Sequence, residues 1–135
     1  MFEALRLDAA TVTATAEEIR LRIRDLSDDQ RKAYYDRFRK EVRDPDTFAV
    51  LNYFFLAGLH HMYLGNYLRG AVNLLTLLIG IVLLVSGLTL LGTLLVGFIL
   101  VVELMALFRS QVVVAHHNNE VAQDILDDLG KQPFR

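Results

Sequence analysis

Two pairs of adjacent histidines and one isolated glutamate are the residues of this sequence best suited to chemistry. The pairs are His60-His61 and His116-His117, and Glu103 stands alone in a long apolar run. Imidazole nitrogens and carboxylates bind transition metals, exchange protons near neutral pH and form ion pairs. The sequence therefore raises three kinds of chemistry: a metal or haem site, a proton or cation route, and a structural ion pair.

The spacing of the histidines argues against a metal or haem site. Neighbouring residues on a helix point about 100° apart, so one adjacent pair seldom supplies two ligands to one ion. Histidine ligands on a helix are usually separated by three or four residues. The chain also has no cysteine, which excludes thiolate sites and disulfides. We therefore expect neither a metal nor a cofactor.

No catalytic constellation is visible in the sequence. It contains no Gly-x-Ser-x-Gly motif, no phosphate-binding glycine loop and no pair of carboxylates placed around a cleft. Ser27, Ser86 and Ser110 have no positioned base. We therefore expect this protein not to be an enzyme.

Long apolar runs must position these residues. The chain is 53% hydrophobic and carries a net charge of only -2, so no overall field favours nucleic acid. A helix needs about 20 mainly apolar residues to cross a bilayer. One such run begins at Phe48, and another extends from Ala71 to Phe108. The second would be about 57 Å long as a straight helix, so we expect it to fold back.

The apolar runs predict an all-α integral membrane protein with amphipathic helices at both ends. We expect the long run to turn at Ser86-Gly87 and Gly92, because Ser and Gly are the breakers available there. The spans then fall at about 48–66, 70–87 and 90–109. The alternative to this three-span bundle is a two-span helical hairpin, with the long run tilted, kinked or partly outside the bilayer. The sequence divides into an N-terminal region 1–46, a transmembrane domain 47–109 and a C-terminal tail 110–135.

The N-terminal flank reads as two helices. Ser27 and Gln30 form a capping-box pattern, and Asp44-Pro45-Asp46 ends or kinks the helix that follows. Upstream, one face carries an apolar stripe formed by Val12, Ala16, Ile19, Ile23 and Leu26. This stripe predicts a helix that packs on a neighbour in its own chain or on the membrane, or else a short coiled coil between protomers.

The C-terminal tail reads as one more amphipathic helix over residues 116–130. Gly130 is suited to the C-cap of this helix. One face of the tail is apolar and is formed by Val121, Ile125, Leu126 and Leu129.

Basic residues predict the orientation in the membrane. They precede the first apolar run and are Arg31, Lys32, Arg37, Arg39, Lys40 and Arg43. Positive charge near a span marks the cytoplasmic side, so we expect a cytoplasmic N-terminus in a bacterial inner membrane. Three spans would place the tail outside the cytoplasm, and two would place it inside. The aromatic residues between these charges also allow an RNA-binding interpretation, but attraction to anionic lipid explains the cluster better, so we expect no nucleic-acid partner.

The stretch GLHHMYLGNYLRG, from Gly58 to Gly70, resembles the signature of the TM-two (two-transmembrane) domain family. The residues that match the family pattern are Gly58, His60, Tyr63, Leu64, Gly65, Gly70 and Glu103. His61 replaces a usual arginine, Met62 a usual phenylalanine, and Glu103 the commoner aspartate. The resemblance covers about residues 48–108 and implies an architecture of membrane helices more than an activity.

Each residue of this stretch also has a physical interpretation. Gly58 and Gly65 let helices approach closely in lipid. Tyr63 and Tyr67 suit the membrane–water interface, and Arg69 can extend its head to lipid phosphates there.

Glu103 is the most informative single residue, because a carboxylate within a span is costly and marks a functional site by default. If the first and third spans are parallel, counting residues places His60 level with Glu103 and predicts a contact, with His61 nearby. Asn52 and Asn73 are predicted to form interhelical hydrogen bonds.

Two classes of function remain. The first is a non-enzymatic membrane protein that contacts lipid and either self-associates as a scaffold or serves as an accessory subunit of a larger membrane protein. The second is an oligomeric channel or a proton or cation conduit that uses Glu103, His60 and Asn73. Burial of Glu103 within one protomer would favour the first class, and exposure of Glu103 to a central wet cavity would favour the second.

Overall fold

The computed structural model describes residues 6–54 and 58–131, and this part of the chain is helical without strands. The predicted all-α fold is therefore confirmed. The helices are α2 (Ala9–Arg24), α3 (Asp28–Glu41), α4 (Pro45–Phe54), α5 (Leu59–Tyr63), α6 (Tyr67–Val85), α7 (Thr89–Phe108) and α8 (Ser110–Lys131).

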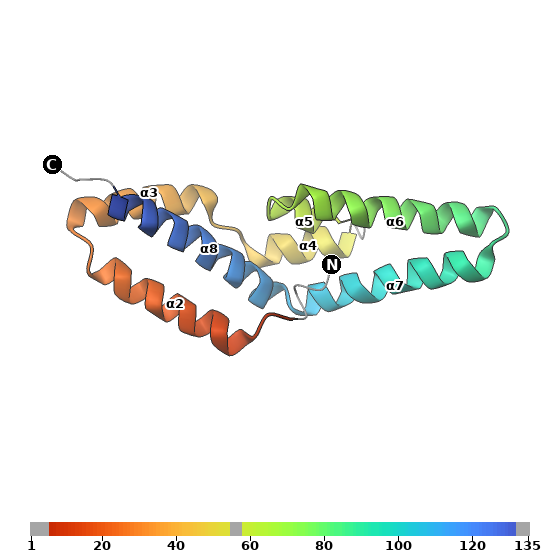
Figure 1. The fold of residues 1–135 in the computed structure, drawn as a ribbon, viewed down its shortest axis with the longest axis horizontal. Coiled ribbons are helices and arrows are strands. Elements are labelled where there is room, and N and C mark those ends of the chain that lie inside the picture. Colours follow the sequence, from red (N-terminus) through yellow and green to blue (C-terminus); the bar gives the residue numbers. More distant parts are fainter. Residues whose placement is uncertain (1–5, 55–57, 132–135) are drawn as a thin grey trace.

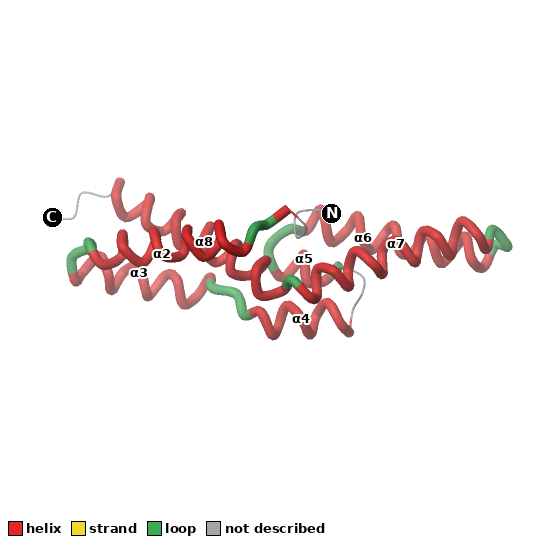
Figure 2. The backbone as a smooth tube through the Cα atoms, turned by 90° about the horizontal axis from the view of Figure 1, so that it is seen from below, coloured by secondary structure: helices red, strands yellow, loops and turns green. Residues whose placement is uncertain are grey.

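The molecule is elongated and has two different ends (Figure 1). Helices α6 and α7 form a hairpin that projects at one end, and α2, α3 and α8 form a bundle at the other. The short helices α4 and α5 lie between them, against the base of the hairpin, as the view turned by 90° also shows (Figure 2). The chain leads from α3 through α4 and α5 into the hairpin, and it returns almost directly from α7 into α8 of the bundle.

Helices α6 and α7 are each long and apolar enough to cross a membrane. Only 17% and 22% of the residues in their most apolar windows are buried, whereas the core helix of a water-soluble protein is mostly buried. Ser86 ends α6, and Gly87 follows with a φ of 88°, so the predicted turn at Ser86-Gly87 is confirmed.

The prediction that Gly92 belongs to this turn is wrong, because Gly92 lies inside α7. A Cβ atom at this position would lie 2.7 Å from the backbone nitrogen of Leu84 and 2.9 Å from the carbonyl oxygen of Gly80. Gly92 therefore allows α6 and α7 to pack closely, which is a common use of glycine between membrane helices.

The first predicted span, at about 48–66, is not a single helix in the described residues. Helix α4 ends at Phe54, and α5 begins after Gly58, which has a left-handed φ of 84°. Residues 55–57 lie outside the part that is described. Among the described helices, α6 and α7 are those both long and apolar enough to cross a membrane, so the third span is not confirmed.

The N-terminal helices pack on α8 of the same chain. Ile19 from α2 and Tyr34 from α3 share a buried core with Ile125, Leu126 and Leu129 of α8. Two ion pairs lie over this core, Arg22–Asp127 at 2.6 Å and Arg37–Asp128 at 3.2 Å.

The predicted stripe of α2 therefore has a neighbour within its own chain. Val12 and Ile19 are buried, Ile23 and Leu26 are half-buried, and Ala16 is exposed. Helices α2 and α3 from the first part of the chain consequently lie beside α8 from its last part, at one end of the hairpin, as Figure 1 shows.

Local signals set some of the helix ends. Ser27 and Gln30 make both bonds of the predicted capping box, and Pro45 is the first residue of α4, a position where the missing N–H costs nothing. The C-cap prediction at Gly130 is wrong because α8 continues to Lys131. Helix α8 also begins at Ser110, before the predicted start at 116.

Candidate functional site

Four buried polar side chains meet at the base of the hairpin, one from each of four helices. Asn52 comes from α4, His60 from α5, Asn73 from α6 and Glu103 from α7. Their exposed fractions are 0%, 0%, 3% and 1%. We call these four residues the polar cluster. Because buried polar groups are costly without partners, the contacts within the polar cluster decide what it can do.

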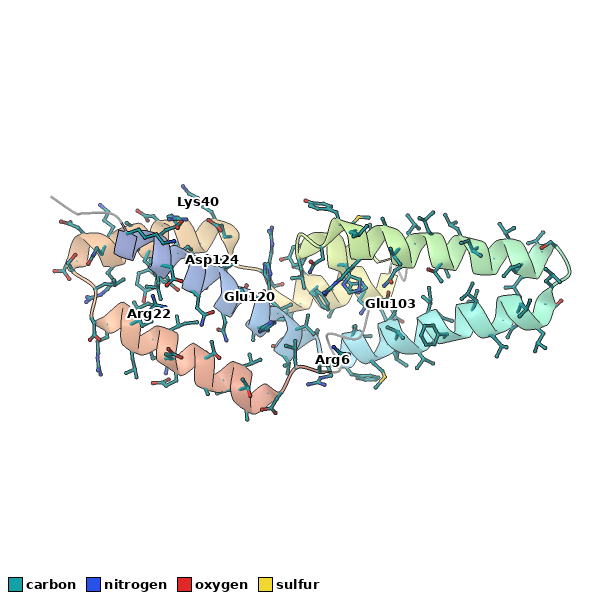
Figure 3. All side chains as sticks on the ribbon, viewed as in Figure 1. Arg6, Arg22, Lys40, Glu103, Glu120 and Asp124 are labelled. Atoms are coloured by element: carbon teal, nitrogen blue, oxygen red, sulfur yellow. The ribbon has the colours of Figure 1, made fainter. Side chains whose placement is uncertain are left out.

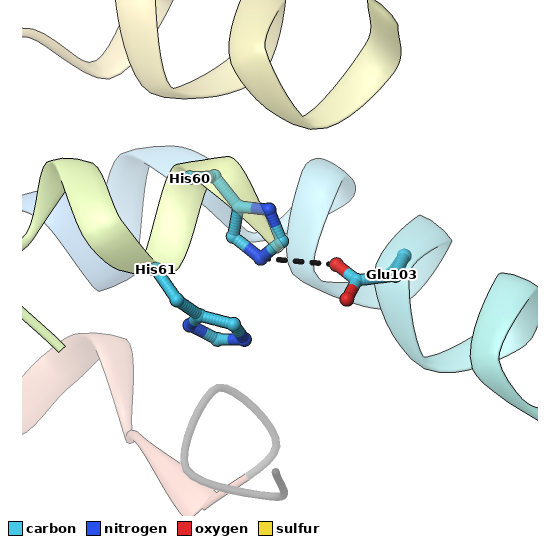
Figure 4. Close-up of side chains that lie close together, drawn as sticks. All are labelled: His60, His61 and Glu103. Atoms are coloured by element: carbon cyan, nitrogen blue, oxygen red, sulfur yellow. Dashed lines mark ion pairs between the residues drawn. The ribbon is translucent and has the colours of Figure 1, made fainter. Parts of the chain in front are cut away.

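Glu103 is the centre of the polar cluster. The Nδ2 atom of Asn73 donates a hydrogen bond of 2.5 Å to one carboxylate oxygen, Oε1. The Nε2 atom of His60 lies 3.0 Å from the other oxygen, Oε2 (Figure 4). The Nδ2 atom of Asn52 donates a hydrogen bond of 3.0 Å to the main-chain oxygen of Glu103. All three neighbours thus hold the same residue from three helices.

The contact between His60 and Glu103 is close in distance but is not aligned as a hydrogen bond. His60 Nε2 and Glu103 Oε2 both lack a hydrogen-bond partner among the described residues, and so does His60 Nδ1. The distance of 3.0 Å nevertheless allows an ion pair when the imidazole is protonated. The contact that residue counting predicted is present, although the helix of His60 is shorter than expected.

Aromatic rings fix the orientation of His60. The edge of the His60 ring meets Phe48 at a centroid distance of 5.1 Å and an interplanar angle of 79°. The ring of His61 lies 4.2 Å from that of His60. Phe48 is itself buried in a small apolar core with Leu64 and Val114, so this core joins α4, the end of α5 and α8 behind the imidazole.

A small cavity borders the polar cluster on the side of α8. Its volume is about 40 Å³, and the residues around it include His61, Glu103, Arg69, His116, His117 and Glu120. A water molecule needs roughly 10–15 Å³ measured in this way, so the cavity has room for a few waters. Glu103 therefore borders both the helix interface and a small cavity lined by polar and apolar residues.

Gly58 and Gly70 allow α5 to pack closely against α6. A Cβ atom at Gly58 would lie 2.7 Å from the carbonyl oxygen of Gly70, so the two backbones meet without side chains between them. Gly65 has a φ of 79° and no atom near its Cβ position. This close approach carries His60 to the level of Glu103.

Three other predicted residues of the stretch 58–70 differ in their contacts and exposure: Tyr63, Leu64 and Tyr67. The hydroxyl of Tyr63 accepts a 3.0 Å hydrogen bond from the backbone nitrogen of Asp44, and the guanidinium of Arg43 lies 5.1 Å from the centroid of the Tyr63 ring. Leu64 is buried, and Tyr67 is 69% exposed at the start of α6.

The structure also shows polar contacts that sequence reasoning missed. The side-chain amide of Asn118 accepts a 2.8 Å hydrogen bond from the backbone nitrogen of Arg43 and donates one of 2.9 Å to its carbonyl oxygen. No sequence signal relates these distant residues. His116 lies 3.6 Å from Glu120, and their four-residue spacing could have revealed this pair.

Charge is distributed unevenly along the molecule. In Figure 3, Arg22 and Asp124 lie on the bundle, whereas Glu103 is the labelled charged residue that lies in the hairpin.

Comparison with protein-family models, with curated proteins and with solved structures finds no match. The contacts of the polar cluster therefore carry the argument about function.

Proposed function

We propose that this chain is a small, non-enzymatic integral membrane protein that acts as a self-associating scaffold or as an accessory subunit of a larger membrane protein. In this proposal the α6–α7 hairpin crosses the bilayer and lipid covers its apolar surface. Large exposed side chains on the hairpin support contact with lipid, among them Leu78, Val82, Leu90, Leu94 and Phe98.

The packing of the two flanks supports their placement on one side of the membrane. Helices α2 and α3 contact α8, and α8 follows the second hairpin helix directly. The basic residues of α3 favour the cytoplasmic side. We propose that both ends are cytoplasmic and that the membrane is the inner membrane of a bacterium. Helices α4 and α5 then line the hairpin base without crossing the bilayer, an architecture that agrees with the resemblance to the TM-two family.

The observation that carries the structural role is the burial of Glu103 within one chain. Its carboxylate is 1% exposed and is held by Asn73 and His60 of the same protomer. Polar contacts between helices stabilise membrane proteins by about 0.6–2 kcal/mol each. The polar cluster thus holds α4 and α5 against the hairpin, and we call this stabilising role a pin.

A surface on α7 supports self-association. Thr93 is exposed, and Gly97 follows it by one helical turn. A Cβ atom at Gly97 would meet no atom of the chain within 4 Å. Small residues four apart on an open helix face allow a second helix to approach closely.

The second candidate is an oligomeric proton or cation conduit. The cavity beside Glu103 favours it, because a carboxylate next to a space large enough for water can exchange protons. The variant Glu103→Gln separates the two roles. A conduit would lose flux while keeping its assembly, whereas a pin would lose stability or assembly.

Native mass spectrometry after extraction in mild detergent tests the proposal. We expect a single species at a multiple of the 15.3 kDa chain mass for a scaffold, or the chain together with a larger protein for an accessory subunit. Gly97→Leu should reduce a homo-oligomer to monomers, and Gly130→Leu on the exposed surface of α8 is the control. A lone monomer extracted from native membranes would contradict both forms of the proposal.

A further inference from the structure

His60, His61 and Glu103 form a group of possible metal ligands. One donor atom from each residue lies within 4.8 Å of the corresponding atoms of the other two. Two of these residues are neighbours on α5, and the third comes from α7. Figure 4 shows both imidazoles beside Glu103. A carboxylate from another helix thus supplies what the adjacent histidines lack by themselves.

Donor atoms in this group remain unused. His60 is 0% exposed and Glu103 is 1% exposed, yet His60 Nε2 and Glu103 Oε2 have no hydrogen-bond partner among the described residues. A buried polar atom without such a bond destabilises the folded state. The two atoms face one another at 3.0 Å, so a shared cation between them would satisfy both.

We propose that His60, His61 and Glu103 bind one divalent transition-metal ion, with Zn²⁺ as the best match. Two imidazoles and one carboxylate are a common donor set for zinc, with metal–ligand distances of about 2.0–2.2 Å. Ligands at these distances lie roughly 3.3–3.6 Å apart around a tetrahedral ion. The 3.0 Å separation of His60 and Glu103 is close to this range, and the His61 donor, within 4.8 Å of the other two, would move closer to complete the set.

The surroundings support a metal centre. Asn73 donates to Oε1 and leaves Oε2 available, which is how a neighbouring hydrogen bond orients a ligating carboxylate. Asn52 holds the main chain of Glu103. The cavity borders both His61 and Glu103, so it offers a route for the ion and space for a water as fourth ligand. The positive ion would also neutralise the buried carboxylate.

This inference rests on the proposed function, because the metal would strengthen the same pin between α5 and α7. A coordinated ion, instead of a direct contact between two side chains, would then join the two helices. Metal binding requires a neutral imidazole and an ionised carboxylate.

The experiment uses the full chain, purified in mild detergent with a tag that contains no histidine and stripped with a chelator. Zn²⁺ affinity is measured by competition with a chromophoric chelator, and Co²⁺ is added separately for its visible absorption spectrum. We expect one ion per chain and a tetrahedral Co²⁺ spectrum. His61→Ala and Glu103→Gln should lower the Zn²⁺ affinity at least about tenfold, and Asn73→Ala should lower it about 10–100-fold.

The double variant His116→Ala/His117→Ala is the control, since it removes the remaining histidines and keeps the proposed ligands. It should keep the wild-type affinity. Loss of binding in this control together with retained binding in His61→Ala would move the site to α8 and overturn the proposal. Absence of stoichiometric Zn²⁺ binding in the wild-type chain would also overturn it. Native mass spectra of the same samples test the metal site and the proposed function separately. An assembly that binds no metal would contradict only the metal site. A lone monomer that binds metal would contradict only the scaffold or accessory-subunit role.

Discussion

His60 and Glu103 face one another at 3.0 Å in the interior of the molecule, and the pair joins α5 to α7. Both side chains are almost completely removed from solvent. Neither group has bulk water to replace a lost partner, so removal of one leaves the other buried and uncompensated.

Replacement of Glu103 with alanine should therefore lower the free energy of unfolding by about 3–5 kcal/mol, the usual cost of breaking a buried pair. Glu103→Gln should cost less, because its amide oxygen can still accept the hydrogen bond from Asn73. Chemical denaturation in detergent measures both. Glu17→Ala is the control, since Glu17 pairs with Arg20 on the exposed surface of α2 and its loss should cost at most about 1 kcal/mol. Equal losses in Glu103→Ala and Glu17→Ala would contradict a pin at Glu103.

Close packing of the hairpin predicts a strong effect at Gly92. Alanine there places a Cβ atom 2.7 Å from the backbone of Leu84, which must move. We expect Gly92→Ala to lower the free energy of unfolding by about 1–3 kcal/mol. Gly130→Ala receives the same methyl group in open space on α8 and should be neutral or up to about 1 kcal/mol more stable. Thermal unfolding of both variants in one detergent makes the comparison, and a Gly92→Ala variant as stable as wild type would show that the helices are not in this contact.

Gly58 and Gly65 allow backbone strain to be separated from steric contact. Both have a positive φ, so alanine strains either position by about 1–2 kcal/mol. Only Gly58 also faces backbone atoms, those of Gly70. We expect Gly58→Ala to be the more damaging variant in the same unfolding measurement. Equal effects would mean that the approach of α5 to α6 contributes nothing beyond the turn conformation.

His117, one of the two histidines on α8, predicts a pH dependence of stability. Burial lowers the pKa of His117 below its usual value of 6.5. Below pH 6.5 the unfolded chain therefore binds more protons at this residue than the folded chain, so stability is complete above that pH and falls as the solution becomes more acidic. His117→Gln should flatten this part of the profile, measured as the unfolding midpoint between pH 7 and pH 5. An unchanged slope in the variant would assign the pH dependence to other groups.

Local sequence signals determined much of the secondary structure. The capping box at Ser27, the turn at Ser86-Gly87 and the two apolar helices could be predicted because each depends on residues close together in the chain. The apolar stripe of α2 was also visible, although the sequence left open whether a neighbour in the chain, the membrane or another protomer would cover it.

Glycine showed the limit of this reasoning. Gly87 ends a helix, whereas Gly92 and Gly130 lie inside helices. The residue type signals only that a turn is sterically allowed. Whether the helix continues depends on distant partners, such as the backbone of Leu84 for Gly92 and the core contacts of Leu129 for the last turns of α8.

For the candidate site too, the sequence determined some features and the tertiary structure determined the others. The sequence determined that a carboxylate at position 103 would lie among apolar residues and would need a partner, and counting along the chain selected His60. It could not determine that α4 and α5 are separate short helices, nor that side chains from four helices would meet at this carboxylate. Those facts depend on the backbone contact of Gly58 with Gly70 and on the hydrogen bonds of Asn52 and Asn73 to Glu103. Such contacts join residues far apart in the chain, so only the packing of the whole molecule decides them.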